Sequence, residues 1–351
     1  MALILTAPAR WLERADPGSH RRVKGLRLVT AYGLAAMCGA LQESGKGASG
    51  GNLLSSLAGG FALWASVSEG QSSRGKSARD LLILCGAAGV GALSMLWLSP
   101  LLSGPGRPGS ELTLASGAFL VGYLKRFGIS GAGVGSQIYI GQLLAFGAGL
   151  MPPDAGTVVL ASGIAAISAM VPRFLSGPAE HPVSFQALPP AGPRRPSTSL
   201  AMGVQAATAA LAIVLLNGVV ALEESAWAVT ACTYVIASSA TGTMDRVRRR
   251  ILGTVIGVPF GLVLLPAAAQ RPILLWAAAA LAMIVYAIAL PDRYDVACGA
   301  FAFTLMVTLA ASGVHSDLLL TARIWETIIG CALGLAASRL VFPLGGVLSR
   351  E

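Results

Sequence analysis

The stretch that decides the fold is Trp227–Gly261, with the sequence WAVTACTYVIASSATGTMDRVRRRILGTVIGVPFG. It opens with an apolar run that also carries hydroxyl groups. A charged segment from Asp245 to Arg250 follows, and a second apolar run comes after it. Two apolar runs around a basic segment predict two membrane helices joined by a tight turn that faces the cytoplasm. The residues of this predicted cytoplasmic basic turn are Asp245, Arg246, Arg248, Arg249 and Arg250.

Spacing within this stretch suggests a role for each helix. Gly253, Gly257 and Gly261 are each four residues apart, so they form a stripe of small residues that lets another helix pack closely. In the first run, Thr230, Thr233 and Tyr234 lie on one helix face, where they would line a polar path. The simpler alternative is a basic cytoplasmic turn followed by packing glycines, with no role in transport.

The composition extends the membrane interpretation to the whole chain. Hydrophobic residues make up 54% of the 351 residues and charged residues only 12%, and the mean hydropathy is +0.70. A soluble domain carries about 25% charged residues. Long apolar stretches with so few charges predict membrane spans. The net charge of +9 is better explained by cytoplasmic loops than by nucleic-acid binding.

The sequence carries no signature of a metal site, a cofactor or an enzyme. Its five cysteines stand singly in apolar runs and its three histidines lie far apart, which argues against zinc binding and a disulfide framework. No phosphate-binding loop, G-x-S-x-G or H-E-x-x-H pattern is present. We therefore expect no metal, no cofactor and no catalytic residues.

Apolar runs and polar breaks predict an all-α polytopic membrane protein of about twelve spans. Ten spans with two re-entrant segments is the alternative, because several runs are short. Six prolines and Arg194-Arg195 make residues 176–199 an extended cytoplasmic linker between residues 1–175, which open with a short cytoplasmic segment, and residues 200–351. The predicted spans cover residues 25–41, 52–68, 81–101, 111–124, 132–150, 155–172, 200–222, 226–243, 250–266, 271–290, 295–313 and 318–343.

The basic residues set the predicted topology. With twelve spans and the N-terminus inside, all but four of the 25 Lys and Arg residues fall on the cytoplasmic side. The exceptions are Lys46, Arg107, Arg271 and Arg323. Such an imbalance predicts that both termini are cytoplasmic.

The two halves also share an order of features, which predicts an internal repeat. Each half has a short helix pair with a basic connection, then a basic stop, then a span rich in small residues. With six spans per half, the repeats would be parallel and related by an axis along the membrane normal, as is common in transporters.

Ionisable residues inside a span are costly, so they are functional candidates. Arg323 and Glu326 lie three residues apart on one face of the last span. Arg323 would attract an anion, and the carboxylate of Glu326 would hold the arginine in place. Glu326 is also the candidate for proton coupling. The alternatives are a structural salt bridge and an arginine that reaches the outer interface.

Other polar side chains complete the predicted substrate path. Gln137 and Gln142 lie in a glycine-rich span, where hydrogen bonds to a substrate and hydrogen bonds between helices are equally expected. Thr304 lies in the eleventh span. The predicted path residues are Gln137, Gln142, Thr230, Thr233, Tyr234, Thr304 and Arg323.

Two segments carry a resemblance to a known family. Trp227-Ala-Val-Thr230, followed by Arg250-Ile-Leu-Gly253-Thr254-Val-Ile-Gly257, resembles the fusaric acid resistance (FUSC-like) aromatic acid exporter family. Arg323-Ile-Trp-Glu326-Thr327-Ile-Ile-Gly330 resembles that family's second motif helix. The resemblance covers residues 200–343 well and the first half weakly, and the large cytoplasmic domains of bigger members have no counterpart here.

The resemblance implies a bacterial inner-membrane exporter of small, mostly aromatic carboxylates that is driven by the proton gradient. Plant aluminium-activated malate channels look related, so a passive anion channel is the first alternative, and a non-transporting membrane scaffold is the second. The expected partners are the lipid bilayer and a small organic anion, and no nucleic acid. A homodimer and a periplasmic adaptor stay open.

Overall fold

The computed structural model is built from α-helices. It describes residue 16 and residues 19–44, 52–70, 73–104, 109–176, 196–264, 272–290, 292–311 and 317–344, and no strand occurs among them. Two short 3-10 helices, η2 (Leu124–Phe127) and η3 (Pro152–Asp154), join longer elements. The α-helices are α2 (His20–Ser44), α3 (Leu53–Ser68), α4 (Arg74–Leu102), α5 (Leu112–Tyr123), α6 (Gly128–Gly147), α7 (Ala155–Leu175), α8 (Pro196–Val220), α9 (Ser225–Val235), α10 (Ala240–Val263), α12 (Pro272–Ala289), α13 (Tyr294–Ala311) and α14 (Asp317–Leu340).

Each predicted span overlaps at least one of these helices, but only some of the helices are long. By length and composition, Arg74–Leu102, Pro152–Leu175 and Ser197–Val220 suffice to cross a membrane. Leu53–Ser68, Ile273–Ala289 and Tyr294–Ala310 are shorter apolar helices. The chain is therefore a helical, multi-pass membrane protein.

The connection between α9 and α10 differs from the prediction. Helix α9 ends at Val235, eight residues before the predicted end, and α10 begins at Ala240. The hydroxyl of Ser239 accepts the backbone N–H of Gly242 and so caps α10. Residues 245–250 are therefore helical, and the predicted basic turn is wrong. Arginine favours helices, and the serine pair before it supplies the break.

The Pro-rich linker is also shorter than predicted. Helix α8 begins at Pro196, so the last four residues of the predicted linker, 196–199, are helical. Proline fits the first position of a helix because it has no N–H to leave unpaired. Residues 177–195, which hold the rest of the linker, lie outside the described residues, as do residues 1–15 of the predicted N-terminal segment.

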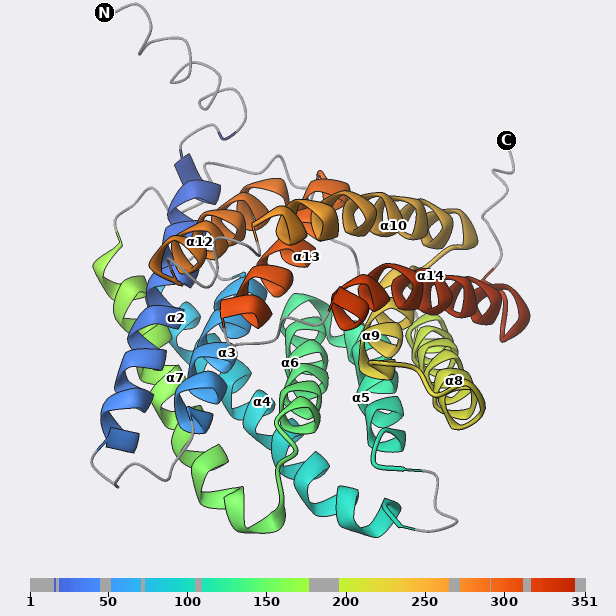
Figure 1. Cartoon of the computed structure of the whole chain (residues 1–351), viewed down its shortest axis with the longest axis horizontal. Helices are drawn as coiled ribbons and strands as arrows, with labels where there is room; N and C mark the ends of the chain where they lie inside the picture. The colour runs from blue at the N-terminus through green and yellow to red at the C-terminus, as the bar shows by residue number, and fades with distance from the viewer. Residues whose placement is uncertain are drawn as a thin grey trace, which may run out of the picture.

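The same pattern of helix packing occurs in both halves (Figure 1). In the first half, α4 packs on α6 and α7, α6 packs on α5, and α7 packs on α2 and α3. In the second half, α10 packs on α13 and α14, α13 packs on α12, and α14 packs on α8 and α9. Between the halves, α5 packs on α8 and α12 packs on α2.

Glycines set the close helix contacts. A Cβ on Gly91 of α4 would lie 2.0 Å from the carbonyl oxygen of Ile138 in α6. A Cβ on Gly257 of α10 would lie 2.2 Å from the carbonyl oxygen of Gly299 in α13, and Gly253 and Gly261 contact the same helix equally closely. The glycine stripe of α10 is therefore the surface that meets α13.

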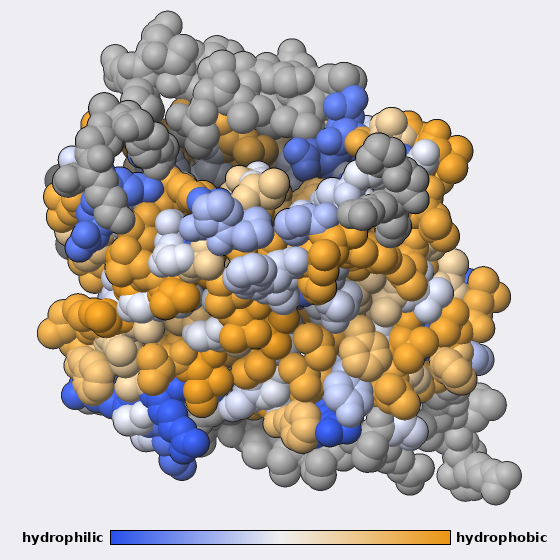
Figure 2. Space-filling view, turned by 90° about the horizontal axis from the view of Figure 1, so that it is seen from below, coloured by the Kyte–Doolittle hydropathy of each residue, from blue (hydrophilic) through white to orange (hydrophobic). Residues whose placement is uncertain are grey.

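The outside of the molecule is apolar. Figure 2 shows a face covered largely by hydrophobic residues, with strongly hydrophilic residues in small patches toward its upper and lower borders. Leu175, Val219, Ile273 and Leu340 each expose more than four-fifths of their surface. An apolar surface of this extent is unfavourable in water and is accommodated by a lipid bilayer.

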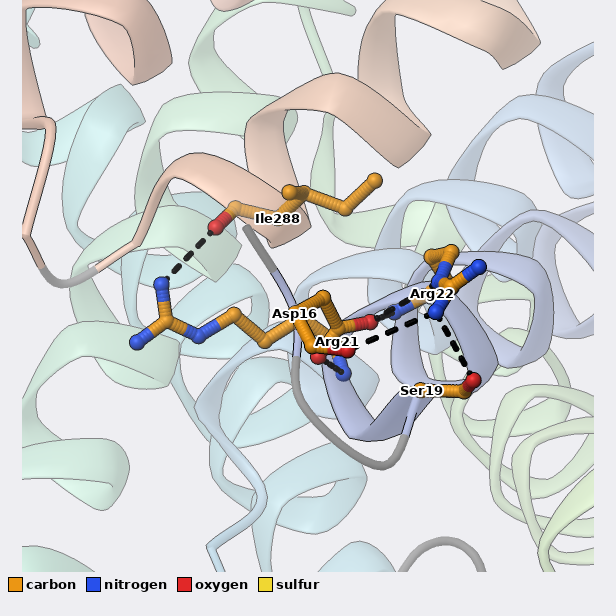
Figure 3. A network of polar contacts seen from close by, with 5 residues as sticks. All are labelled: Asp16, Ser19, Arg21, Arg22 and Ile288. Carbon is orange, nitrogen blue, oxygen red and sulfur yellow. Dashed lines mark hydrogen bonds and ion pairs between the residues drawn. The ribbon is translucent and has the colours of Figure 1, made fainter. Parts of the chain in front are cut away.

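A polar network ties the start of α2 to the end of α12 (Figure 3). The buried carboxylate of Asp16 accepts the backbone N–H groups of Arg21 and Arg22, at 3.0 and 2.9 Å. The guanidinium of Arg21 reaches across to the carbonyl oxygen of Ile288 at 3.2 Å and to the carboxylate of Asp292 at 2.6 Å. Asp16 thus orders a helix whose arginine links the two halves of the chain.

Candidate functional site

A cluster of aromatic and cationic side chains lies where α3 and α6 of the first half meet helices of the second half. Most of its aromatic rings keep some accessible surface although they lie among helices from both halves, whereas Tyr139 is fully buried. We call this group the central cluster. Its members are Trp64, Tyr139, Trp227, Tyr234, Arg250, Tyr286, Tyr294, Phe301 and Arg323.

Arg323 of α14 is the cation at its centre. Only 2% of its surface is exposed. Its Cζ lies 5.1 Å from the ring centroid of Trp227 and 5.7 Å from that of Phe301, so the guanidinium is held by two cation–π contacts. Its Nε has no hydrogen-bond partner. Trp227 therefore contacts the buried arginine.

Glu326 does not pair with Arg323, contrary to the expectation that it holds the arginine. Its Oε1 accepts the backbone N–H of Glu224 at 2.8 Å, and its buried Oε2 has no hydrogen-bond partner. Among the described residues, neither side chain forms an ion pair. The spacing places both on one face, but the arginine turns to the aromatic rings while the glutamate turns to the start of α9.

Hydroxyl groups join α6 to α9 beside the arginine. Tyr139 and Thr230 share a hydrogen bond of 2.9 Å, and Ser136 and Tyr234 share one of 2.7 Å. The rings of Tyr139 and Tyr234 meet edge to face with their centroids 5.9 Å apart. Thr233, by contrast, bonds to the carbonyl of Val229 in its own helix. Thr230 and Tyr234 thus belong to the surface that joins the two halves.

Gln137 lies on the first-half side of the cluster. Its Nε2 donates to the carbonyl of Trp64 and the hydroxyl of Ser68, at 2.8 and 2.9 Å, and its buried Oε1 has no partner. The Trp64 ring packs on Phe301, with centroids 5.4 Å apart, and on Tyr286. Trp64 therefore lies between Gln137 and Phe301, whose ring contacts Arg323.

Two of the predicted path residues have their contacts elsewhere. Gln142 donates to Ser94 and Ser116, at 3.1 and 3.0 Å, and so holds α4, α5 and α6 together. Thr304 donates to the carbonyl of Ala300, one turn back in α13, at 2.9 Å. Within the part of the chain that the structure describes, neither side chain forms a hydrogen bond with a member of the central cluster. Both therefore fit a packing role better than a place on a substrate path.

Sequence reasoning missed Arg250 as a member of the cluster. It lies in the third turn of α10, only 7% exposed, and donates to the hydroxyl of Tyr294 at 3.2 Å. One signal was available. Arg250 precedes Gly253 by three residues and Gly257 by seven, so it shares the helix face that packs inward. The rings of Trp64, Tyr139, Tyr286 and Phe301 gave no such signal, because their neighbours are distant in sequence.

Carboxylates gather around the loop that precedes α9. The side chain of Glu111 accepts both hydrogen bonds of the Asn217 amide, at 2.8 and 3.0 Å. In the loop before α9, burial raises the pKa of Glu224, and the negative charges of Glu111 and Glu223 raise it further. Among the described residues, no group of His, Cys, Asp and Glu could hold a metal ion.

Comparison with known proteins supports the family resemblance. Residues 208–337 match the family model described as fusaric acid resistance protein-like. No curated protein and no solved structure matches the chain. The matched residues run from α8 to α14 and include Trp227, Arg250, Arg323 and Glu326. Residues 208–337 are therefore similar to the fusaric acid resistance protein-like family.

Proposed function

We propose that this protein exports small aromatic carboxylates across the bacterial inner membrane. The observation that carries the proposal is Arg323, a buried guanidinium without a carboxylate partner among the described residues. An uncompensated buried charge is costly, and a bound anion would remove that cost. The export role extends what the similarity of residues 208–337 to this family suggests.

The surroundings of Arg323 fit an aromatic substrate. Trp227 and Phe301 lie against the guanidinium, and Trp64 and Tyr286 pack around Phe301. Aromatic rings attract one another in stacked and edge-to-face arrangements. A benzoate-like anion would place its carboxylate at Arg323 and its ring among these side chains.

The hydroxyls between α6 and α9 would line the route to this point. Thr230 and Tyr234 belong to one half of that route and Ser136 and Tyr139 to the other. These four groups are hydrogen-bonded in pairs across the two halves, so a relative movement of the halves would free them to bind a passing carboxylate. Neither a cofactor nor a catalytic step is part of this proposal.

We infer that Glu326 couples transport to protons. Its Oε2 is buried and has no partner, so the carboxyl can bind a proton without breaking a bond at that oxygen. The other oxygen is held by the backbone of Glu224, which keeps the group in place in both protonation states. Uphill export would follow if proton entry at Glu326 and anion release at Arg323 alternate.

The similar helix packing of the two halves supports an architecture of two six-helix repeats, as in many transporters. The corresponding helix pairs are α4 with α6 and α10 with α13, and they pack similarly closely through Gly91 and Gly257. Ser73 and Ser239 cap α4 and α10 in the same way. We propose twelve spans in two parallel repeats with both termini in the cytoplasm, which agrees with the distribution of Lys and Arg.

A passive anion channel is the second candidate, because the same arginine would serve it without a titrating group. The two are separated by benzoate efflux from vesicles containing purified protein, with and without a pH gradient. An exporter concentrates benzoate against its gradient, and Glu326→Gln abolishes this uphill component while benzoate exchange persists. Glu223→Gln, which alters an exposed carboxylate in the neighbouring loop, is the control and behaves as wild type.

Electrical conduction of benzoate without uphill movement would contradict the exporter and favour the channel. Absence of both activities would favour a membrane scaffold that transports nothing.

A further inference from the structure

Arg250 differs from the other arginines of its segment. Arg249 bonds to Asp245 at 3.1 Å and to the carbonyl of Asp292, and Arg246 donates to the carbonyl of Ile236. Arg250 is buried, and its recorded hydrogen-bond partner is the neutral hydroxyl of Tyr294. Its Nε is buried without a partner. This guanidinium therefore has hydrogen-bonding capacity and positive charge that the described residues do not satisfy.

The chain does pair a buried arginine with an acid elsewhere. In the first half, Arg27 and Glu69 are both nearly inaccessible and form an ion pair of 2.7 Å. Neither Arg250 nor Arg323 has such a partner among the described residues. Two buried cations without carboxylates are thus concentrated in the second half, within the central cluster.

The two cations are close enough to affect each other. Both lie against α13, where Arg250 bonds to Tyr294 and Arg323 contacts the ring of Phe301, and their own helices α10 and α14 pack on each other. Their positive charges therefore repel each other. A bound monocarboxylate would neutralise one positive charge and leave the other uncompensated. A ligand with two negative charges would neutralise both.

We propose that Arg250 forms a second anion subsite beside Arg323, and that the two together select an aromatic dicarboxylate over a monocarboxylate. Arg250 would bind one carboxylate with its free Nε, next to the hydroxyl of Tyr294, and Arg323 would bind the other. The predicted topology places the start of α10 on the cytoplasmic side of the membrane. A substrate that enters from the cytoplasm would therefore meet Arg250 before Arg323. The inference rests on the proposed anion transport and names its substrate class.

The test is calorimetric binding of benzoate and terephthalate to the purified full-length protein. Wild type binds terephthalate at least about tenfold more tightly than benzoate, which is the gain expected from one added charge-assisted contact. Arg250→Gln weakens terephthalate binding much more than benzoate binding, so it removes most of this preference. Arg323→Gln weakens the binding of both anions. Arg248→Gln, an exposed position two residues away on the same helix, is the control and changes neither affinity.

Arg250→Lys keeps the positive charge in place, so it replaces the glutamine variant in the binding test if that variant does not fold. It retains the preference for terephthalate, though with weaker binding, because an ammonium cannot match the planar guanidinium. Equal affinities of wild type for the two anions would overturn the second subsite while leaving anion binding at Arg323 intact. An unchanged preference in Arg250→Gln would also overturn it. Failure of wild type to bind either anion would overturn both this inference and the proposed function.

Discussion

Buried charges in this protein fall into two kinds according to their partners. Arg27 pairs with Glu69, and Arg173 donates to the hydroxyl of Ser77 at 2.8 Å, so these arginines hold helices together. Arg323 and Arg250 contact aromatic rings and a phenol instead. A charge that binds a ligand must keep part of its capacity free, and only the second kind does so.

Glu224 is a single residue whose titration should make the free energy of unfolding depend on pH. Its pKa lies above the ordinary value of 4.5, because of burial and then because of Glu111 and Glu223. The folded state therefore binds the proton more tightly than the unfolded state does. The free energy of unfolding should fall as pH rises from about 4.5 through the raised pKa.

Glu224→Gln should remove this fall, so the variant gains thermal stability over wild type at pH 7 and loses the gain below about pH 4.5. The backbone hydrogen bond to Glu326 is kept, because the substitution changes only the side chain. Thermal unfolding in detergent between pH 4 and 8 measures the difference. Parallel curves for the two proteins across this range would contradict the assignment.

Helix contacts in this fold depend on the absence of side chains at particular points. Gly257→Leu should separate α10 from α13, because a Cβ there meets the carbonyl of Gly299 at 2.2 Å. We expect a loss of at least about 3 kcal/mol in stability, with a fall in the yield of folded protein. Gly163→Leu on α7 is the matched control, since no atom lies within 4 Å of its Cβ position. Equal yields and melting temperatures for both variants would show that the stripe does not hold the two helices together.

The start of α2 gives a second prediction for an element. Asp16→Ala removes an acceptor for two backbone N–H groups of the first helical turn. The expected loss is about 1–2 kcal/mol, typical of helix capping. Asp292→Ala should cost less, because that ion pair with Arg21 is largely exposed and such pairs contribute little. Thermal unfolding measures the stability lost in each variant. A larger loss of stability for Asp292→Ala than for Asp16→Ala would contradict the capping role of Asp16.

Apolar runs were sufficient to predict roughly where the helices lie, since every predicted span overlaps at least one helix. They did not reveal that α9 stops at Val235, because Ser238 and Ser239 stand in a run that is otherwise suited to a helix. Ser239 accepts the backbone N–H of Gly242 and so starts a new helix, a local competition that hydrophobicity does not register.

The candidate site was predictable only in part. Spacing placed Arg323 and Glu326 on one face, but it does not determine which neighbours each side chain meets. Those neighbours, Trp227 for the arginine and the backbone of Glu224 for the glutamate, depend on how α9 packs against α14. The aromatic rings from α3 and α13 are likewise set by tertiary packing and not by local sequence.

At the scale of the whole molecule, the halves meet around a charged and aromatic centre inside an apolar shell. The outer helices bury their small residues against each other and expose leucine, isoleucine and valine outward. The halves pack together at α5 with α8 and at α12 with α2, and the central cluster adds hydrogen bonds between α6 and α9. An arrangement of this kind would allow the halves to move relative to each other and change access to Arg323.

The central claim is that Arg323 is held unpaired in order to bind the carboxylate of a substrate. The most direct measurement is the melting temperature of purified wild type and Arg323→Gln, each with and without benzoate, with Arg248→Gln as control. We predict that benzoate raises the melting temperature of wild type and of Arg248→Gln but not that of Arg323→Gln. Without benzoate, Arg323→Gln should be at least as stable as wild type, because it removes an uncompensated buried charge. An Arg323→Gln protein that is several kcal/mol less stable, yet still stabilised by benzoate, would show that the arginine is structural and would contradict the claim.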